Sequence, residues 1–343
     1  MLAIGLDVHD RHTTVATLDT ETGELSHRRV ETPLVVAYVT ELPQPKCIGL
    51  ETGSQSFFFA RKLLSLGLQV MVLDAFKVHR RAEALHTAKT DRLDATTLAR
   101  MVAEGGGDAE VWLADEALDE LRTLARTHRQ LVQAGSRLRC QIRALVRHEG
   151  QGCPYTNLMG KAAGMWLDEF AADLPPCKQM ALSVLRQSLQ ENVTHIRQLH
   201  ALMREVAAGN EAIRRLRTIC GCGLVLSLTI AAEIGDIWRF AQPKHLRGYS
   251  GLTPRVAQSG EHTYSGPITR KGNPYLRHSL ILLAQQVARS KKLAGTRLKR
   301  FYNRHAVRHG ENPAKVALGR KLCDIIFAML RNETDFDLQR LAT

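Results

Sequence analysis

The stretch that decides the first part of the fold is MLAIGLDVHDRHTTVATLDT, residues 1–20. Its apolar residues 2–8 are typical of a strand, and Asp7 stands near the end of that strand. Residues 11–32 continue as strand-like segments on either side of the turn formers TETGE at 20–24, which predicts a hairpin. We therefore expect a sheet whose first strand carries an acid close to its end.

Further strands and helices follow in alternation. KCIGLE, residues 46–51, is a short apolar strand that ends in Glu51. Residues 56–68 have a helical pattern, residues 69–76 are strand-like, and helical spacing returns from about residue 91. A hairpin followed by alternating strands and helices predicts an α/β sheet domain.

Heptad spacing begins near residue 115 and predicts long helices. The first apolar series is Ala117, Leu121, Leu124, His128, Leu131, Gly135, Leu138, Ile142 and Leu145. The second is Leu182, Leu185, Leu189, Ile196, Leu199, Met203 and Val206. Pro- and Gly-containing stretches at 150–157 and 173–179 separate the two series. Such a pair of helices forms either an antiparallel hairpin or an intermolecular coiled coil, and the spacing leaves both open.

Arginines flank the first heptad series, and acids are almost absent between residues 121 and 148. Charged flanks are ordinary on a solvated helix face, but a run of one sign favours contact with phosphates. We therefore take Arg137, Arg139 and Arg143 as candidate nucleic-acid contacts.

The overall composition points the same way. The formal net charge is +13, which indicates a polyanionic partner, nucleic acid before membrane, since aromatic residues are only 5%. No apolar run is long enough to span a bilayer, and the N-terminal residues 1–10 have no basic n-region or cleavage site, so no signal peptide is expected. The 7 cysteines lack the spacing of a zinc site or a disulfide framework. A cytoplasmic protein that does not bind membranes is the expectation.

Two aspartates lie three residues apart in KTDRLDATTLARM, residues 89–101. Thr90 or Asp91 could cap a helix here, because both residue types cap well and acids suit a first turn. The alternative is half of a metal site, since Asp91 and Asp94 fall on one helix face.

Asp7 and Glu51, each at a strand end, could complete that site at the edge of the sheet. Four carboxylates so close repel one another unless divalent cations neutralise them. Oxygen ligands suit Mg²⁺, or Mn²⁺ in its place, and a pair of such ions supports phosphoryl transfer.

A rival reading uses the same strands. IGLDVHDRHTTVATLD, residues 4–19, is also similar to the first phosphate loop of sugar kinases and actin-like ATPases. That loop needs a glycine directly after the acid, where this chain has Val8 and His9. The basic charge and the heptad helices also argue against a small-molecule kinase.

The C-terminal part changes character again. Residues 216–236 are typical of a helix, a glycine hairpin and a second helix, and glycines allow backbone amides to approach a phosphate. Residues 245–280 are rich in Gly, Ser, Pro and basic residues and are expected to be loop-like. Helical spacing then resumes to the C-terminus.

Several of these motifs resemble a known family. GLDVH (5–9), LETG (50–53) and AKTDRLDA (88–95) resemble the four-acid (DEDD) catalytic domain of a class of bacterial insertion-sequence transposases. The segment 240–277, FAQPKHLRGYSGLTPRVAQSGEHTYSGPITRKGNPYLR, resembles the C-terminal transposase domain of the same class, the bridge-RNA-guided recombinases. The resemblance covers both ends of the chain, and the middle matches only in kind.

The resemblance implies three parts: a ribonuclease-H-like, RuvC-type domain at 1–112, a coiled-coil region at 113–210, and a mostly helical transposase domain with a helix-hairpin-helix at 211–343. The metal-binding acids then correspond to Asp7, Glu51, Asp91 and Asp94, and the nucleophilic serine to Ser259.

This chain departs from the family pattern in two places. It has TICGCG at 218–223 where the family usually has a proline-glycine turn, which bears on the hairpin's contact with DNA. It also has Ser250 where alanine is common, which adds a second serine to consider as nucleophile.

A serine before a glycine is most often a turn residue, so Ser259 depends on its surroundings. Arg255, Arg270, Lys271 and Arg277 are close in sequence and could hold a scissile phosphate. The resulting hypothesis is an RNA-guided DNA transposase or recombinase. Its partners would be target DNA, donor DNA, a structured noncoding guide RNA, and further copies of itself in a dimer or tetramer. A metal-dependent Holliday-junction-type nuclease and a non-catalytic nucleic-acid-binding protein are the alternatives.

Overall fold

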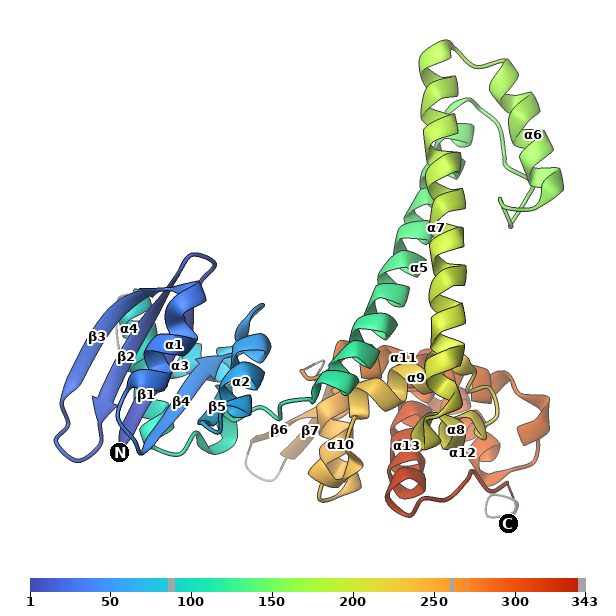
Figure 1. Cartoon of the computed structure of the whole chain (residues 1–343). Helices are drawn as coiled ribbons and strands as arrows, with labels where there is room; N and C mark the ends of the chain where they lie inside the picture. Colours follow the sequence, from blue (N-terminus) through green and yellow to red (C-terminus); the bar gives the residue numbers. More distant parts are fainter. Residues whose placement is uncertain (86–89, 260–261, 270, 339–343) are drawn as a thin grey trace. The chain divides into compact units, whose positions relative to one another are not determined.

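The computed structural model describes residues 1–85, 90–259, 262–269 and 271–338. These residues form two compact units, Met1–Asp115 and Glu116–Thr343, which are treated separately below (Figure 1). The predicted division into three parts at 112/113 and 210/211 stays a prediction.

The first unit is built on a five-stranded sheet in the order β3-β2-β1-β4-β5 (Figure 1). β1 (Leu2–Val8) pairs antiparallel with β2 (His12–Asp19), which pairs antiparallel with β3 (Leu25–Glu31). On its other side β1 pairs parallel with β4 (Lys46–Glu51), and β4 pairs parallel with β5 (Gln69–Leu73). The predicted α/β sheet is confirmed.

Helices cover both faces of this sheet because alternate residues of each strand are apolar on both sides. α1 (Val35–Glu41) and α2 (Ser56–Ser65) share one core with Ile4, Leu6, Ile48 and Leu50. α3 (Ala75–Leu85) and α4 (Asp91–Ala103) cover the opposite face. The residues of that second core include Ala3, Cys47, Leu73, Val78, Leu98 and Val102.

Two glycines allow α4 to lie unusually close to the sheet. A methyl group at Gly5 of β1 would collide with the backbone of Ala95 and Ala99 in α4. One at Gly49, its partner on β4, would collide with the side chain of Val102. The helix therefore rests on the strand backbone itself, in the way that glycine in a strand permits.

The second unit begins with two long helices. α5 (Glu116–His148) and α7 (Pro176–Ala208) pack side by side within one chain as an antiparallel hairpin, and α6 (Lys161–Ala172) lies against its far end (Figure 1). The hairpin is thus one of the two arrangements that the heptad spacing allowed. Whether the helices also pair between chains stays a prediction.

The heptad spacing describes the seam only in part. Of the predicted positions on α5, His128, Gly135 and Ile142 are buried and Ala117 is exposed. Val146 is buried next to the predicted Leu145, because a straight helix has 3.6 residues per turn and drifts from a strict seven-residue repeat.

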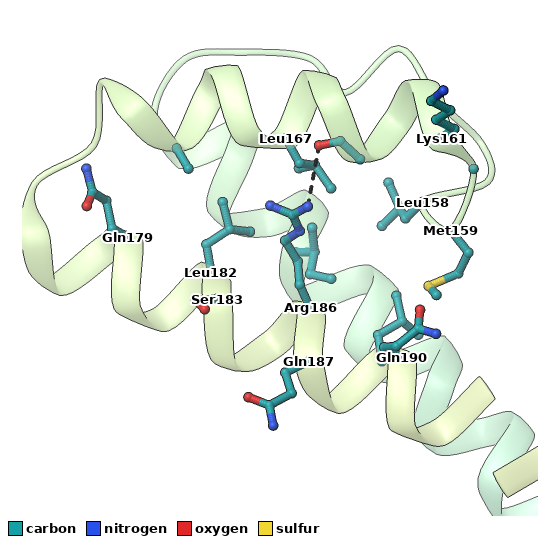
Figure 2. Close-up of a pocket in the computed structure, with 15 residues that line it drawn as sticks. Leu158, Met159, Lys161, Leu167, Gln179, Leu182, Ser183, Arg186, Gln187 and Gln190 are labelled. Atoms are coloured by element: carbon teal, nitrogen blue, oxygen red, sulfur yellow. Dashed lines mark hydrogen bonds between the residues drawn. The ribbon is translucent and has the colours of Figure 1, made fainter. Parts of the chain in front are cut away.

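A cavity of about 510 Å³ lies at the far end of the hairpin, between α6 and α7 (Figure 2). Arg186 of α7 crosses it to Asp168 of α6, with 2.6 Å between Nη1 and Oδ1. Leu167 and Leu182 pack beneath this ion pair in the same core. The tip is therefore a small packed structure with its own apolar centre.

A histidine pair lies in the α5–α7 seam. The Nε2 atoms of His128 and His200 are 2.9 Å apart, and their rings stack with centroids 4.8 Å apart. Burial, and then the neighbouring His200, lower the pKa of His128.

We expect acid to destabilise the hairpin through this pair. Because the pKa of His128 is lower in the folded chain, the unfolded chain binds more protons as pH falls through and below the ordinary value of about 6.5. The free energy of unfolding should therefore drop between pH 7.5 and 5.5 in urea titrations, and drop less in His128→Gln. An equal drop in both proteins would contradict this.

The chain then turns into a helical body. α8 (Glu211–Arg217) and α9 (Leu224–Ile234) are joined by the turn TICGCG, where Gly221 has a φ of 87°. A side chain at Gly221 would meet Gln286, so glycine is required both for its conformation and for its space. A helix, a glycine turn and a helix are present, as predicted; their role as a DNA-binding helix-hairpin-helix stays a prediction.

The segment expected to be loop-like is largely ordered into regular elements, so that expectation was wrong. α10 (Pro243–Ser250) is followed by the antiparallel hairpin of β6 (Pro254–Ser259) and β7 (His262–Ile268), and then by α11 (Pro274–Arg289). The Gly, Ser and Pro residues lie in a strand, at element ends and in short connections, where their composition alone could not show pairing.

α12 (Arg297–His309) and α13 (Glu311–Arg331) complete this body. One apolar core unites α8 to α13 and includes Leu228, Leu246, Leu276 and Leu318. Within the described residues, the helices are all too short or too polar to cross a bilayer.

Candidate active site

Strand register brings two of the predicted acids together. β1 and β4 pair with Gly5 opposite Gly49 and Leu6 opposite Leu50, so the next pair in register is Asp7 and Glu51. Alternation places both acids on the face that Gly5 and Gly49 present to α4. Asp7 is only 6% exposed.

The helix start resolves the two readings of residues 89–101 in part. Thr90 is the N-cap of α4, since its Oγ1 accepts from the Leu93 amide at 3.3 Å and its backbone is extended. Asp91 is therefore the first helical residue, with an exposed carboxylate, and Asp94 is half-buried one turn on. The cap does not need either acid. Lys89, which belongs to the same motif, lies outside the described residues.

The acids of the helix lie close to the acid of the strand. His9 Nε2 is 3.2 Å from Asp7 Oδ2 and 3.7 Å from Asp91 Oδ1, and potential ligand atoms of these three residues all lie within 4.8 Å of one another. Burial raises the pKa of Asp7, and repulsion from Asp91 and Asp94 raises it further, while His9 opposes these effects. Three of the four predicted acids thus interact electrostatically, and register places Glu51 beside them.

This donor set fits a divalent cation. A buried carboxylate beside two others is unfavourable in the metal-free chain, as the raised pKa of Asp7 shows, and a divalent cation would remove the repulsion. Carboxylate oxygens predominate, which favours a hard ion such as Mg²⁺ or Mn²⁺.

His9 was not predicted as a member of this group. The available signal was its position two residues after Asp7, because strand alternation carries residues i and i+2 to the same side. Its side chain is more than half exposed, so it can reach both Asp7 and a solvent-borne ligand.

The predicted nucleophile lies on the β6–β7 hairpin. Ser259 ends β6 and pairs with His262 of β7 next to the hairpin turn. The structure describes the backbone of Ser259 but not its side chain, and Arg270 lies outside the described residues. Arg255 is exposed at the register shift of β6, which is a bulge-like irregularity of the kind that re-aims side chains.

The other cations near the serine frame the start of α11. Lys271 is exposed just before this helix, and Arg277 of its first turn donates to the Ser250 carbonyl at 3.3 Å. Ser250 itself is fully buried and its hydroxyl donates to the Arg247 carbonyl at 2.7 Å. That hydroxyl is therefore a helix-end contact and has no access to a phosphodiester.

The arginines of α5 fall into different groups. Arg137 is exposed and Arg139 half-buried, and their contact with phosphates stays a prediction. Arg143 instead donates to the carbonyls of Tyr155 and Thr156, at 3.4 and 2.5 Å, and holds the segment that follows the helix.

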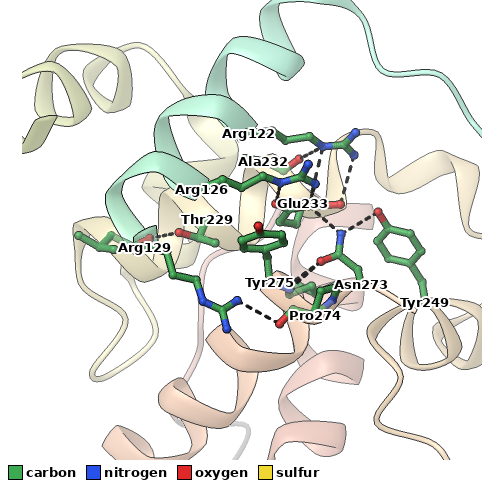
Figure 3. Close-up of polar contacts among 12 residues, drawn as sticks. Arg122, Arg126, Arg129, Thr229, Ala232, Glu233, Tyr249, Asn273, Pro274 and Tyr275 are labelled. Carbon is green, nitrogen blue, oxygen red and sulfur yellow. Dashed lines mark hydrogen bonds and ion pairs between the residues drawn. The ribbon is translucent and has the colours of Figure 1, made fainter. Parts of the chain in front are cut away.

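At the base of α5 the arginines are structural (Figure 3). Arg126 binds Glu233 of α9 with two parallel hydrogen bonds of 2.8 Å, and Arg122 approaches the same carboxylate. Asn273 donates to Glu233 at 2.7 Å and caps α11 through its Oδ1. Glu233 is fully buried. Arg122 and Arg126 therefore belong to a buried ion-pair network, which ties the hairpin to the segment that carries Lys271.

Removing the charge of Glu233 should be costly. Glu233→Gln keeps the shape but leaves Arg126 without its counter-charge, and breaking a buried ion pair costs about 3–5 kcal/mol. We expect about 3 kcal/mol, because the Arg126 side chain is 38% exposed and water can compensate in part. Chemical unfolding would measure this.

Glu211→Gln is the matched control. Its carboxylate also pairs with an arginine, Arg214, but is 63% exposed, so its loss should cost less than about 1 kcal/mol. Similar losses in the two variants would contradict a structural role for the Glu233 network.

Comparison with known proteins agrees with this arrangement. Residues 4–149 match the model of a DEDD transposase domain of the IS110 type, and residues 213–302 match the model described as Transposase IS116/IS110/IS902 family. The transposase for insertion sequence element IS1111A of Coxiella burnetii is 26% identical over 315 residues, which cover 90% of this chain and 84% of that protein.

Two further relatives extend the comparison. The transposase for insertion sequence element IS1328 of Yersinia enterocolitica is 23% identical over 296 residues, 85% of this chain and 86% of that protein. The Sinorhizobium fredii protein y4qE, which is named provisionally as a transposase, is 32% identical over 232 residues. That match covers 67% of this chain but only 56% of the relative.

The sheet with its acids and helix α5 thus lie in the part that matches the DEDD transposase domain, and the part from α8 into α12 lies in the second match. The DEDD domain suggests dependence on a divalent metal. The chain belongs to the IS110/IS116 transposase family, with the DEDD domain at the N-terminus and the family's second domain at the C-terminus.

Proposed function

We propose that this chain is an RNA-guided, Mg²⁺-dependent DNA transposase or recombinase that cleaves and exchanges strands through a phosphoserine–DNA intermediate. The observation that carries the proposal is the convergence of Asp7, Asp91 and Asp94, with Glu51 in register beside them. When bound, Mg²⁺ would supply Lewis-acid stabilisation of the charge that develops on a phosphodiester.

The first unit is proposed to be ribonuclease-H-like and RuvC-type. Three antiparallel strands followed by two parallel ones, in the order β3-β2-β1-β4-β5, support this assignment. Acids on adjacent central strands and on the helix that packs across them are then in the place where such a domain would hold DNA. The proposed boundaries remain 1–112, 113–210 and 211–343.

Ser259 is proposed as the nucleophile. Its Oγ would form a bond to phosphorus as the bond from phosphorus to the leaving sugar oxygen breaks. The serine proton passes to a base and the leaving oxygen gains a proton, so the number of phosphodiester bonds is conserved and rejoining needs no ATP. Arg255, Arg270, Lys271 and Arg277 are proposed to hold the phosphate.

Sequence choice is proposed to lie in a structured noncoding RNA that pairs with target and donor DNA. The net charge of +13, the exposed Arg137 and the half-buried Arg139 support backbone contacts with nucleic acid. The hairpin of α5 and α7 is proposed to build a dimer or tetramer.

The testing experiment incubates the purified chain with labelled DNA spanning an element end, with and without RNA transcribed from the element's flank. The proposed phosphoserine mechanism predicts a denaturation-resistant protein–DNA adduct that requires Mg²⁺ and RNA. Free cleaved ends without an adduct would favour a Holliday-junction-type nuclease, and binding without cleavage would favour a non-catalytic protein.

A further inference from the structure

An open cavity of about 590 Å³ lies beside the acidic group, where β2 and β3 meet the start of α4. Its lining residues are Thr14, His27, Arg28, Arg29, Thr90, Asp91 and Arg92. Asp91 belongs both to this cavity and to the group of Asp7 and His9. A ligand in the cavity would therefore touch the edge of the metal-binding acids.

Strand register connects the acids at the ends of β1 and β4 with residues that line this cavity. Asp7 of β1 pairs with Thr14 of β2, and Thr14 pairs with Arg29 of β3. With Glu51 in register on β4, one row of side chains runs across β4, β1, β2 and β3. It consists of two carboxylates, a hydroxyl and a guanidinium, from Glu51, Asp7, Thr14 and Arg29. Neighbouring strands are about 4.8 Å apart, so Arg29 starts roughly 10 Å from Asp7 along the row.

All four residues of this row lie on the α4 face. Gly5 lies two residues before Asp7 on β1, and Ala16 lies two residues after Thr14 on β2, so both are on the same face as this row. Both lie against Ala95 and Ala99 of α4. The start of α4, which adds Arg92, therefore closes the cavity on one side. Gln or Lys at 92 would keep the helix, because this residue is exposed.

The cavity is positively charged. Arg28 stacks on Tyr38, 5.0 Å from the ring centre to the guanidinium carbon, but Arg29 and Arg92 form no ion pair with any residue that the structure describes. This contrasts with Arg126, whose charge Glu233 neutralises. Unneutralised guanidinium groups beside a hydroxyl are typical of phosphate recognition.

His27 adds a polar group to the same wall. Its Nε2 lies 2.7 Å from Thr96 Oγ1, while its Nδ1 is buried without a partner among the described residues. Buried polar atoms usually have a hydrogen-bond partner, so this nitrogen is suited to a bound ligand or water.

We propose that this basic pocket, formed by Thr14, His27, Arg29 and Arg92, binds a backbone phosphate of the nucleic-acid strand whose neighbouring phosphodiester lies at the acids. The inference rests on the proposed function and adds a subsite to it. The lining offers no phenyl or indole ring for stacking on a base, so the contact would be independent of sequence.

The test uses the full-length chain and fluorescent single-stranded DNA and RNA of one sequence, with binding measured over a range of salt concentrations. Arg29→Gln/Arg92→Gln should bind about tenfold more weakly. Loss of one phosphate contact should also make the slope of log affinity against log salt shallower by about 0.7. Arg29→Lys/Arg92→Lys should recover the slope, which would exclude misfolding as the cause.

Arg100→Gln is the matched control, because Arg100 is exposed at the opposite end of the same helix. It should bind like the wild type. A loss seen with DNA supports the subsite, whereas a loss seen only with RNA would place the pocket on the guide and contradict a contact with the strand that lies at the acids. An unchanged slope for both probes in the double Gln variant overturns it.

Binding of Mn²⁺, followed by electron paramagnetic resonance without nucleic acid, separates this inference from the proposed function. The double Gln variant should bind Mn²⁺ like the wild type, because the acids are intact. If wild-type protein forms no adduct but the slope still changes, the proposed chemistry fails and the phosphate pocket stands.

Discussion

Ser259→Ala is expected to form no denaturation-resistant adduct with DNA and to lose strand exchange by about 10⁴-fold or more, since removing a nucleophile can cost up to about 10⁶-fold. The methyl group cannot attack phosphorus, and the acids proposed to hold the metal are on other elements. Binding of DNA and of Mn²⁺ should therefore persist. Gel electrophoresis under denaturing conditions, with labelled DNA, would measure the adduct.

Ser250→Ala is the control for this experiment. It removes one buried hydrogen bond, worth about 1 kcal/mol, and leaves the β6–β7 hairpin untouched. Its adduct should form as in the wild type. An adduct that survives in Ser259→Ala would show that another group attacks the phosphate, and the serine would then be a hairpin residue.

Asp7→Asn and Asp91→Asn are expected to abolish Mg²⁺-dependent cleavage, because an amide is neutral and a weaker ligand for a hard cation. Asp7→Asn should also have a favourable effect, because it should raise the stability of the metal-free protein. Burial and the nearby Asp91 and Asp94 raise the pKa of Asp7, so its charged form destabilises the metal-free fold. Stability falls as pH rises through the interval between the unfolded and the raised folded pKa.

The metal-free Asp7→Asn protein should therefore melt at a higher temperature than wild type at pH 7.5, and the difference should shrink towards pH 4. Thermal unfolding in chelator would show this. Asp108→Asn, at an exposed acid paired with Lys77, should change neither cleavage nor stability by much. Cleavage by Asp91→Asn at the wild-type rate would reduce that residue to an ordinary first-turn acid.

The acidic group was predictable because each member carries a local signal. Asp7 and Glu51 end apolar strands, and Asp91 and Asp94 are spaced for one helix face. Parallel pairing of two such strands then follows from the α/β pattern, and their register places Asp7 next to Glu51. His9 could have been predicted by the same strand alternation. It was not, because a histidine directly after a strand is usually an exposed residue with no role in a site.

The contacts of the helical body were not predictable in this way. Arg126 and Glu233 are 107 residues apart, and no periodicity shows that one charge neutralises the other. The run of arginines favoured contact with phosphates, and nothing in it showed that the base of α5 is an ion-pair network. The β6–β7 hairpin was hidden by its composition, because strand pairing depends on neighbours that lie outside a short window.

Gly5 and Gly49 have a consequence for which ion the first unit would select. Gly5 lies against the backbone of α4 and Gly49 against its Val102 side chain, so the acids of β1 and β4 are held close to those of α4. Mg²⁺ requires a tighter and more regular shell than Ca²⁺, and only a site with little freedom to widen can enforce that difference. Under the proposed function, metal selectivity would then be encoded in two residues that have no ligand atoms. Gly5→Ala would push α4 away from the sheet and so act on the choice of cation by widening the site, although none of the four carboxylates is substituted.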